Sequence, residues 1–453
     1  MRILALDQGT TSTRVLEALG GDLRIIGQMR HATTYPQPEW VEQDAREILA
    51  NCRALLAAAG PADAIGLANQ GESCLAWDPV TKEPLSAILT WQDRRTLAEL
   101  SALAPQAEEV KALSGLPLDP YFSASKLGWL ARRHPGARLG TTDAFLLDNL
   151  TGAFATDRAT ASRTGLINLA TGEWDARLCA IFGVPMAALP EIRGNLAGFG
   201  RVEGTPITAA IVDQQAALYG HSCRSPGQAK ITFGTGAFAL AVTGPRVPQA
   251  GGLVPTVAWD LDAGMVYALD GGVQDAGSAV EWALRAGIAE GLQDFDGFGL
   301  SAVDRGLIFL PAFSGLGAPD WDRSAAPLII GLGPEMTRRD LCQALIEGVA
   351  FQTAALVAEL GRLLPLAGAL SIDGGLANSA YFTQFLARLC QRPLTVSGFG
   401  ECTALGVAQL AARALGAELD PVGAPLSVPM AEPRPDWQAR FDAALQRARH
   451  WRS

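Results

Sequence analysis

The sequence lacks the features of an exported or membrane-spanning protein. Its seven cysteines are scattered, odd in number and never spaced as Cys-x-x-Cys, which favours isolated reduced thiols in a cytoplasm. No apolar run reaches the ~18 to 20 residues of a membrane span, and the first residues lack the basic, apolar and cleavage regions of a signal peptide. We therefore expect a cytoplasmic protein with no membrane span.

Positive charge is also scarce. Lysine and arginine together number 36 against 46 aspartates and glutamates, which gives a formal net charge of -10. Such a chain is a poor partner for nucleic acid or for an anionic membrane surface, so we expect neither as the main partner. Phosphate binding is still allowed, because it depends on local amides, arginine and a metal ion.

Apolar residues, by contrast, are plentiful. They make up 49% of the 453 residues, and charged residues make up 18%, as in a globular protein with a large core. This length exceeds what one core supports, so we expect two domains. A glycine- and proline-containing stretch at 220–227 is the predicted linker, which gives an N-terminal domain over 1–222 and a C-terminal domain over 228–453.

Apolar patterning predicts strands that alternate with helices, as in α/β proteins with sheet cores. The predicted strands are 3–6, 15–19, 64–67, 207–212, 229–233, 237–242 and 369–372. The predicted helices are 44–59, 102–112, 125–133, 276–286, 337–364, 403–415 and 437–451.

Two turns rich in glycine and hydroxyl groups open the two halves of the chain. The strand at 3–6 runs into Asp7-Gln8-Gly9-Thr10-Thr11-Ser12-Thr13-Arg14, and the strand at 229–233 runs into Gly234-Thr235-Gly236. Glycine lets a backbone approach a ligand closely, and successive amides in such a turn attract anions. Either turn alone could be an ordinary hairpin, but the repetition predicts one nucleotide held between two related halves.

A third polar group follows the strand at 207–212, which ends directly on Asp213-Gln214-Gln215. A carboxylate at a strand end can take a proton from a substrate hydroxyl as a general base. The alternative is that Asp213 only caps the next helix.

These segments form part of a longer series of motifs. In chain order they are Asp7–Arg14, Tyr35–Asp44, Thr90–Thr96, Asp119–Leu130, Asp213–Leu218, Phe233–Gly236, Gly315–Pro319, 331–348 and Asp373–Gly375. Together they resemble the motifs of the FGGY carbohydrate kinases, and of the glycerol kinases in particular, over residues 1 to about 415.

The resemblance implies an α/β fold of two actin-like (ribonuclease-H-like) domains that flank a cleft for nucleotide and substrate. It implies an ATP-dependent kinase that uses Mg²⁺ to phosphorylate a hydroxyl of a polyol or sugar, and a homodimer or homotetramer. It makes Asp213 the catalytic base and assigns Asp7 and Asp213 to the metal. The implied ATP-binding residues are Thr10, Thr11, Ser12, Arg14, Gly234, Thr235, Gly317, Gly374, Gly375 and Asn378.

The substrate residues are where the sequence departs from the glycerol kinases. Those kinases read Asn-Gln-Arg-Glu-Thr where this chain has Gly71 in place of the arginine, and they carry a phenylalanine where it has Gln274. Both changes indicate a larger, more polar pocket, and hence a longer polyol or a sugar, with glycerol itself as the alternative. The implied substrate-binding residues are Gly71, Glu72, Trp91, Tyr121, Asp213, Gln214 and Gln274.

Two other classes of function are less consistent with these residues than a kinase. An actin-like ATPase that performs conformational work needs no polyol pocket, so Glu72 and Tyr121 argue against it. A non-catalytic sugar-binding regulator has no need of a base together with a metal site, so Asp7 and Asp213 argue against that.

Overall fold

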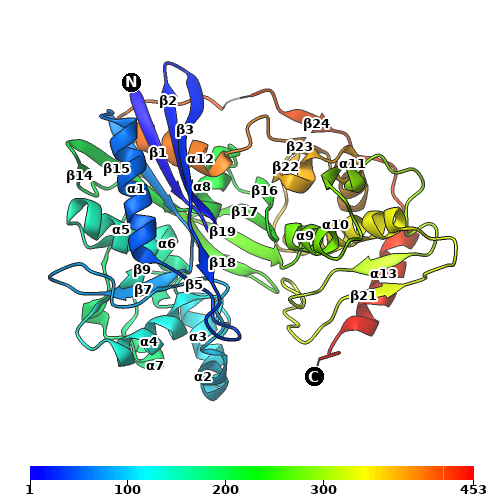
Figure 1. Ribbon diagram of the computed structural model, residues 1–453, viewed down its shortest axis with the longest axis horizontal. Coiled ribbons are helices and arrows are strands. Elements are labelled where there is room, and N and C mark those ends of the chain that lie inside the picture. The colour runs from blue at the N-terminus through cyan, green and yellow to red at the C-terminus, as the bar shows by residue number, and fades with distance from the viewer. Residues whose placement is uncertain (422, 453) are drawn as a thin grey trace.

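The computed structural model describes residues 1–421 and 423–452. The chain forms two halves that lie side by side, each built on a central sheet (Figure 1). The first half runs to about residue 220, and the second follows it.

The first sheet has the strand order β14-β15-β6-β1-β2-β3. Its strands are β1 (Arg2–Gln8), β2 (Ser12–Leu19), β3 (Asp22–Arg30), β6 (Ala64–Asn69), β14 (Arg201–Val202) and β15 (Thr205–Val212). β1, β6 and β15 run parallel, and the register aligns Gln8, Asn69 and Val212 at their carboxyl ends. Whatever follows these three strands therefore meets at one edge of the sheet.

The second sheet repeats this arrangement. Its order is β18-β19-β17-β16-β22-β23-β24. The antiparallel strands β16, β17 and β19 correspond to β1, β2 and β3 of the first sheet, and the parallel strands β22 and β23 correspond to β6 and β15. The bounds are β16 (Ala229–Phe233), β17 (Ala237–Gly244), β18 (Val254–Leu261), β19 (Gly264–Val273), β22 (Leu370–Gly374), β23 (Leu394–Val396) and β24 (Leu426–Val428). The predicted relation between the two halves is confirmed.

Smaller sheets and helices complete the two halves. The remaining strands are β4 (Thr33–Thr34), β5 (Glu42–Gln43), β7 (Cys74–Trp77), β8 (Ile88–Leu89), β9 (Arg138–Thr141), β10 (Ala155–Asp157), β11 (Ile167–Asn168), β12 (Glu173–Trp174), β13 (Glu191–Arg193), β20 (Ile308–Leu310) and β21 (Leu328–Ile330). The helices are α1 (Ala45–Ala59), α2 (Leu97–Ala102), α3 (Ala107–Ser114), α4 (Ser123–Arg133), α5 (Thr142–Thr151), α6 (Arg158–Ser162), α7 (Ala176–Phe182), α8 (Asp213–Gly220), α9 (Gly277–Arg285), α10 (Arg338–Leu363), α11 (Ala380–Cys390), α12 (Cys402–Arg413) and α13 (Pro435–Ala448). Short 3-10 turns lie at Ala104–Gln106, Met186–Ala188, Leu292–Phe295 and Gly375–Asn378.

The predicted helix over 102–112 is wrong as one element. The chain leaves α2 at Ala102, passes through the 3-10 turn Ala104–Gln106 and enters α3 at Ala107. Pro105 has no backbone N–H and cannot continue the helical ladder, so the break lies at that residue. The other predicted helices and strands are present within a few residues of their predicted ends. The pattern missed β3, which is largely exposed, together with β18 and β19.

Within residues 1–421 and 423–452, α10 is the one helix long and apolar enough to cross a membrane, and 83% of its apolar window is buried inside the protein. Its Phe351 stacks on Phe441 of α13 with ring centroids 4.6 Å apart. The helix is thus the core of the second half. All seven cysteines are free thiols, as the sequence predicts.

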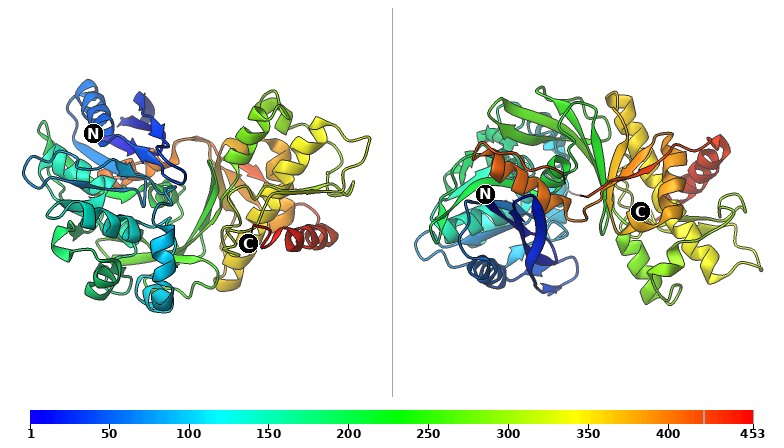
Figure 2. Two further views of the ribbon diagram at one scale, coloured as in Figure 1. Left: turned by 60° about the horizontal axis from the view of Figure 1, so that its bottom comes forward. Right: turned by 90° about the horizontal axis from the view of Figure 1, so that it is seen from above.

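The helix α12 belongs to the second half by sequence but packs on the first sheet, against β1, β6 and α8. Figures 1 and 2 show it beside the blue strands. The approach is close, because a Cβ on Gly406 would lie 1.8 Å from the Ala216 carbonyl oxygen, and one on Gly220 would lie 2.1 Å from that of Cys402. Glycine at both positions permits this contact.

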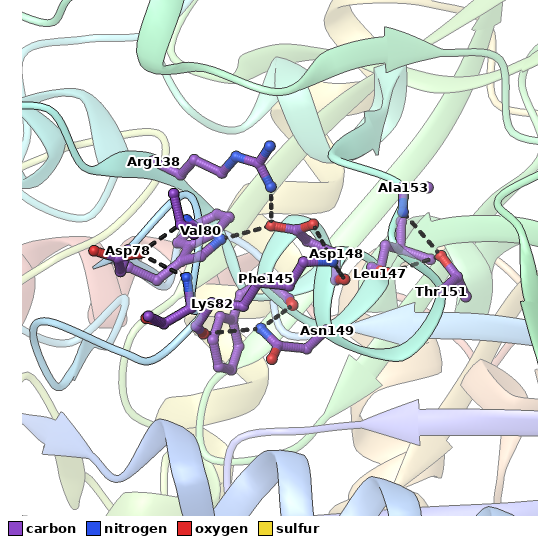
Figure 3. Close-up of polar contacts among 12 residues, drawn as sticks. Asp78, Val80, Lys82, Arg138, Phe145, Leu147, Asp148, Asn149, Thr151 and Ala153 are labelled. Carbon is purple, nitrogen blue, oxygen red and sulfur yellow. Dashed lines mark hydrogen bonds and ion pairs between the residues drawn. The ribbon is translucent and has the colours of Figure 1, made fainter.

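The buried carboxylate of Asp148 holds the strand β7, which begins just after Glu72. The Asp148 side chain of α5 has no exposed surface, and it accepts a hydrogen bond from Trp77 Nε1 at 2.9 Å. Lys82 and Arg138 also contact this carboxylate (Figure 3). These bonds hold β7 and β9 against α5, and β7 begins two residues after Glu72.

We expect Gly406→Ala to lower the free energy of unfolding by about 1–3 kcal/mol, because the new methyl group would overlap the Ala216 carbonyl. Gly361→Ala is the matched control within α10. A Cβ there would lie 3.9 Å from its nearest neighbour, Leu366 Cδ1, so alanine should stabilise the protein by about 0.5–1 kcal/mol. Urea denaturation measures both, and equal effects of the two changes would contradict the close contact.

Candidate active site

Three carboxylates meet at the carboxyl edge of the first sheet. Asp7 lies near the end of β1, Glu72 follows β6, and Asp213 begins α8 directly after β15. The antiparallel pairing of β1 with β2 sets Arg14 opposite Asp7. Glu72 lies 141 residues before Asp213 in the sequence, and Asp7 lies 206 residues before it. The parallel register of the strands, and not proximity in sequence, therefore brings these side chains together.

A cavity of about 140 Å³ opens beside these carboxylates, and we call it the cleft pocket. Both halves contribute to its lining, so neither half could form it alone. Its lining residues are Thr10, Gly71, Glu72, Trp91, Tyr121, Arg163, Val212, Asp213, Gln214, Gln215, Thr232, Gly234, Thr235 and Phe238.

Aromatic rings form one wall of the cleft pocket. The Trp91 centroid lies 5.7 Å from that of Tyr121 and 6.4 Å from that of Phe238. Trp91 Nε1 donates to Thr10 Oγ1 at 3.1 Å, which ties this wall to the first glycine-rich turn. The pocket therefore offers an apolar face opposite a polar one.

The carboxylates of this site resist ionisation. Burial raises the pKa of Asp213 to about 7, with the negative charges of Glu72 and Asp7 adding to the effect. Burial likewise raises the pKa of Asp7 to about 7, although the Arg14 guanidinium opposes the shift. A cation or a bound proton would relieve both groups.

Glu72 is held in an unusual backbone conformation. Its φ is 53°, in the left-handed region that favours glycine. Its carbonyl accepts a hydrogen bond from Ser123 Oγ at 2.9 Å, and its carboxylate accepts one from Arg163 Nε at 2.6 Å. These contacts fix the side chain toward the pocket against a backbone strain of about 1–3 kcal/mol.

Most of the predicted substrate residues lie together. Gly71, Glu72, Trp91, Tyr121, Asp213 and Gln214 all line the cleft pocket. Gln274 does not; it lines an adjoining outer cavity of about 310 Å³ and a small hollow of about 20 Å³.

Arg163 and Phe238 line the cleft pocket as well, although neither is among the predicted site residues. Arg163 stands in the unremarkable run Ser162-Arg163-Thr164 and carries no local signal. Phe238 follows the second glycine-rich turn by two residues, and that spacing could have indicated it.

The position of Gly71 leaves less room than its small size indicates. A Cβ built on Gly71 would lie 2.8 Å from Val212 Cγ2. A larger residue 71 would therefore first meet Val212 of β15.

Neither glycine at the two predicted phosphate turns is crowded by its neighbours. A Cβ on Gly9 would lie 3.5 Å from its nearest neighbour, and one on Gly234 would lie 4.0 Å from its own. Thr235 is exposed, and so is Thr11. Ser12 is buried and accepts from Gln28 Nε2 at 3.2 Å. Since protein atoms do not fill these turns, a phosphate chain could approach the backbone of each.

The other predicted nucleotide residues differ in their surroundings. Arg14 is paired with Glu401 at the start of α12. Gly374 has φ 93° and packs on the Phe233 carbonyl, whereas Gly375 is open, with Asn378 Nδ2 donating to its carbonyl at 3.3 Å. Gly317 packs against the Gly272 carbonyl oxygen, and a Cβ at residue 317 would lie 2.1 Å from it. Packing within the protein alone therefore requires glycine at this position.

Comparison with known proteins identifies the chain. Residues 2–220 match the N-terminal domain of the FGGY family of carbohydrate kinases, and residues 229–415 match the C-terminal domain of that family. The chain belongs to the FGGY family. It is 42% identical over 448 residues to a glycerol kinase of Methylorubrum populi, covering 91% of this chain and 89% of that protein. It is 40% identical over 447 residues to a glycerol kinase of Rhodospirillum centenum, with the same coverage of 91% and 89%.

Among solved structures, the FGGY chain is similar to a glycerol kinase of Plasmodium falciparum crystallised with ADP. The TM-score is 0.90 at 30% identity, and the match covers 99% of this chain and 98% of that one. The protein is accordingly an ATP-dependent kinase that phosphorylates an alcohol group of a polyol or sugar. The expected two-domain kinase fold is confirmed, and the ATPase and regulator alternatives are set aside.

We expect Gly234→Ala to weaken ADP binding by about tenfold without changing the melting temperature, because the new methyl group would project into the open turn. Gly374→Ala should instead lower the melting temperature, because a Cβ there would lie 2.2 Å from the Phe233 carbonyl oxygen. Calorimetric titration with ADP and thermal unfolding distinguish the two effects. Unchanged ADP affinity in Gly234→Ala would remove this turn from the nucleotide site.

Proposed function

We propose that this FGGY kinase phosphorylates glycerol and that Asp213 is its general base. The size and lining of the cleft pocket carry the proposal. Its volume of about 140 Å³ lies below the roughly 300–1,000 Å³ of sites for drug-sized ligands, which favours a small triol. Glu72, Tyr121 and Asp213 suit hydroxyl groups, while Trp91 and Phe238 suit a short carbon backbone.

Both departures from the glycerol-kinase pattern have a counterpart in the pocket. Arg163 places a guanidinium next to Glu72, although residue 71 is glycine. Phe238 lines the pocket with an aromatic ring, although residue 274 is glutamine. These residues, together with relatives named glycerol kinase at 42% and 40% identity, support glycerol over the longer polyol or sugar that the substitutions alone favoured.

Asp213 acts on the proton of the hydroxyl that is phosphorylated. As that hydroxyl oxygen bonds to the γ-phosphorus of ATP, the bond from this phosphorus to the oxygen that bridges the β- and γ-phosphates breaks and ADP leaves. The hydroxyl proton passes to the Asp213 carboxylate, which becomes a carboxylic acid. A pKa near 7 makes this carboxylate a better proton acceptor than an exposed aspartate while leaving much of it ionised at neutral pH.

Asp7 and Asp213 would hold Mg²⁺, which when bound offsets the negative charge of the phosphates. Their donor oxygens suit this hard cation. Burial raises the pKa of both carboxyl groups, and a bound cation would favour their ionised forms. The turns at Gly9–Ser12 and Gly234–Thr235 would hold the phosphates, with Gly375 and Asn378 near the adenosine. The free thiols support a reducing, cytoplasmic setting.

Asp213→Asn should lower kcat by about two to four orders of magnitude, because a positioned base contributes that much to turnover. The ADP affinity measured without Mg²⁺ and the melting temperature should be unchanged. Coupled-enzyme assay of ADP release with glycerol measures the effect. A variant that turns over within a few-fold of the wild type would exclude Asp213 as the base.

The wild-type pH profile tests the same group independently. Because the active base is the carboxylate and its pKa is about 7, kcat/KM should fall as the pH decreases below about 7. Raising the Mg²⁺ concentration should move this acid limb to lower pH, since the cation favours the ionised carboxylates. An acid limb near pH 4 at every Mg²⁺ concentration would contradict the burial of Asp213.

A substrate panel tests the choice of glycerol. We expect kcat/KM for glycerol to exceed that for tetritols, pentitols and ketoses by about tenfold or more, because the small pocket cannot close around longer chains. A higher kcat/KM for any longer compound would instead support a longer polyol or a sugar as the substrate, as Gly71 and Gln274 indicate.

A further inference from the structure

Three side chains that commonly bind metal ions lie together where the two halves of the chain meet. His221 caps the carboxyl end of α8, Asp373 lies on β22, and Cys402 begins α12. Each offers one ligand atom, and these three atoms all lie within 4.8 Å of one another. Because α8 and α12 pack on the first sheet and β22 belongs to the second, this His-Asp-Cys cluster spans the contact between the halves.

The His-Asp-Cys cluster is shielded from solvent. The His221 side chain has no exposed surface, and the Asp373 side chain is 8% exposed. Cys402 is buried as well. Polar atoms at such a place depend on protein groups or on a bound ion for their partners, because bulk water does not reach them.

The imidazole of His221 is oriented as in a metal-bound histidine. Its Nδ1 lies 2.6 Å from Ser371 Oγ, and this hydrogen bond fixes the plane of the ring. Its Nε2 lies 3.3 Å from Asp373 Oδ2, yet neither Nε2 nor Asp373 Oδ1 has a hydrogen-bond partner, although both atoms are buried. A hydrogen bond on one ring nitrogen, with the other nitrogen left for the metal, is the usual arrangement at protein metal sites.

The spacing of the ligand atoms suits a small ion placed directly between them. Tetrahedral zinc lies about 2.0–2.2 Å from nitrogen and oxygen ligands and about 2.3 Å from sulfur, so its ligand atoms are roughly 3.3 to 3.6 Å apart. The 3.3 Å between His221 Nε2 and Asp373 Oδ2 already matches this separation. Cys402 Sγ, within 4.8 Å of both, needs only a small inward shift. Since the ligands themselves enclose the ion, the site needs no water-sized cavity.

The kinds of ligand select the class of metal. An imidazole and a thiolate beside one carboxylate suit a borderline-soft ion such as Zn²⁺, whereas Mg²⁺ prefers oxygen ligands alone. Burial raises the pKa of Cys402 to about 12, so its sulfur is a thiol in the metal-free protein. The incoming ion displaces the thiol proton, which passes to solvent, and the sulfur binds as a thiolate.

Lys230 of β16 is a positive charge near this cluster. The pKa of Asp373 is lowered, against the effect of burial, by its contact with His221 and by the charges of His221 and Lys230. Lys230 Nζ donates to Thr232 Oγ1 at 3.0 Å. Because burial lowers the pKa of Lys230, this ammonium can lose a proton when a divalent ion binds nearby, which reduces the repulsion between the two cations.

We propose that His221, Asp373 and Cys402 form a binding site for one Zn²⁺ ion that joins the two halves of the enzyme. The ion is bound by His221 Nε2, an Asp373 carboxylate oxygen and Cys402 Sγ, which leaves one position of the tetrahedron for a further ligand. The site is distinct from the one that Asp7 and Asp213 would offer to Mg²⁺, because nitrogen and sulfur contribute to it. An ion held by α8, β22 and α12 at once restricts the motion of one half relative to the other.

Metal binding to the full chain, stripped of metal with a chelator, tests the site. With Mg²⁺ in excess to occupy oxygen ligands in the cleft, calorimetric titration with Zn²⁺ should show one tightly bound equivalent. Ser371→Ala should weaken binding by about 10- to 100-fold, because it removes the support of the histidine. His221→Gln and Cys402→Ser should each weaken it by more than about 100-fold, because each removes a ligand itself. The absence of a tightly bound equivalent in the wild type overturns the proposal.

The spectrum of the Co²⁺-substituted protein identifies the sulfur ligand. The wild type should show the near-ultraviolet charge-transfer absorption of a cobalt–thiolate bond, and Cys402→Ser should lack it. Cys390→Ser is the matched control, because Cys390 of α11 is less buried than the other six cysteines and is the thiol most open to adventitious metal. It should keep both the absorption and the Zn²⁺ affinity. Loss of the absorption in Cys390→Ser, with its retention in Cys402→Ser, overturns the proposal.

Thermal unfolding separates loss of the metal from loss of the fold. One equivalent of Zn²⁺ should raise the melting temperature of the wild type and of Cys390→Ser but not that of Cys402→Ser, because the ligands come together only in the folded chain. If Cys402→Ser does not fold, His221→Gln provides the same comparison. An equal rise in the wild type and in these two ligand variants overturns the site. None of these measurements depends on turnover, so failure of the proposed function would leave their outcome unchanged.

Discussion

Buried negative charge is the constraint around which the cleft is built. Four carboxylates from both halves lie there largely out of water, namely those of Asp7, Glu72, Asp213 and Asp270. Ionised groups are stable in such a place only with cations nearby. Arg163 pairs with both Glu72 and Asp270. Lys230 of β16 partly opposes the rise in the pKa of Asp213 that burial causes. The ion pairs that stabilise these buried carboxylates therefore also connect the two halves. The same contacts serve both the chemistry of the site and the association of the halves.

The part of this architecture that could be predicted from the sequence depends on local patterns. Strand-turn-strand segments with glycine and hydroxyl groups define where β1 and β16 end, because the backbone geometry of such turns depends on neighbours only a few residues away. Placing Asp7 and Asp213 at strand ends needs only the apolar runs before them. Once the strands are parallel, their carboxyl ends must meet, and the acidic edge follows.

Long-range packing decides the rest, and no local pattern records it. Arg163 reaches Glu72 across 91 residues of chain, and its neighbours in sequence give no sign of that. The effect of Gly71 could not be judged without Val212, whose methyl group occupies the adjacent space. Gln274 follows the last residue of β19 and lines the outer cavity and the small hollow, not the cleft pocket. Which of these cavities a residue borders depends on elements far away in the sequence.

The position of α12 has a consequence for how the halves can move. The chain passes from the first sheet to the second after α8, returns to the first sheet in α12, and passes back again to β24. Three separate segments thus connect the halves, and this resists their separation. A single break in the linker near residue 224 would leave the halves still joined by chain on both sides of α12. The enzyme has two lobes in shape, but in connectivity it is one indivisible unit.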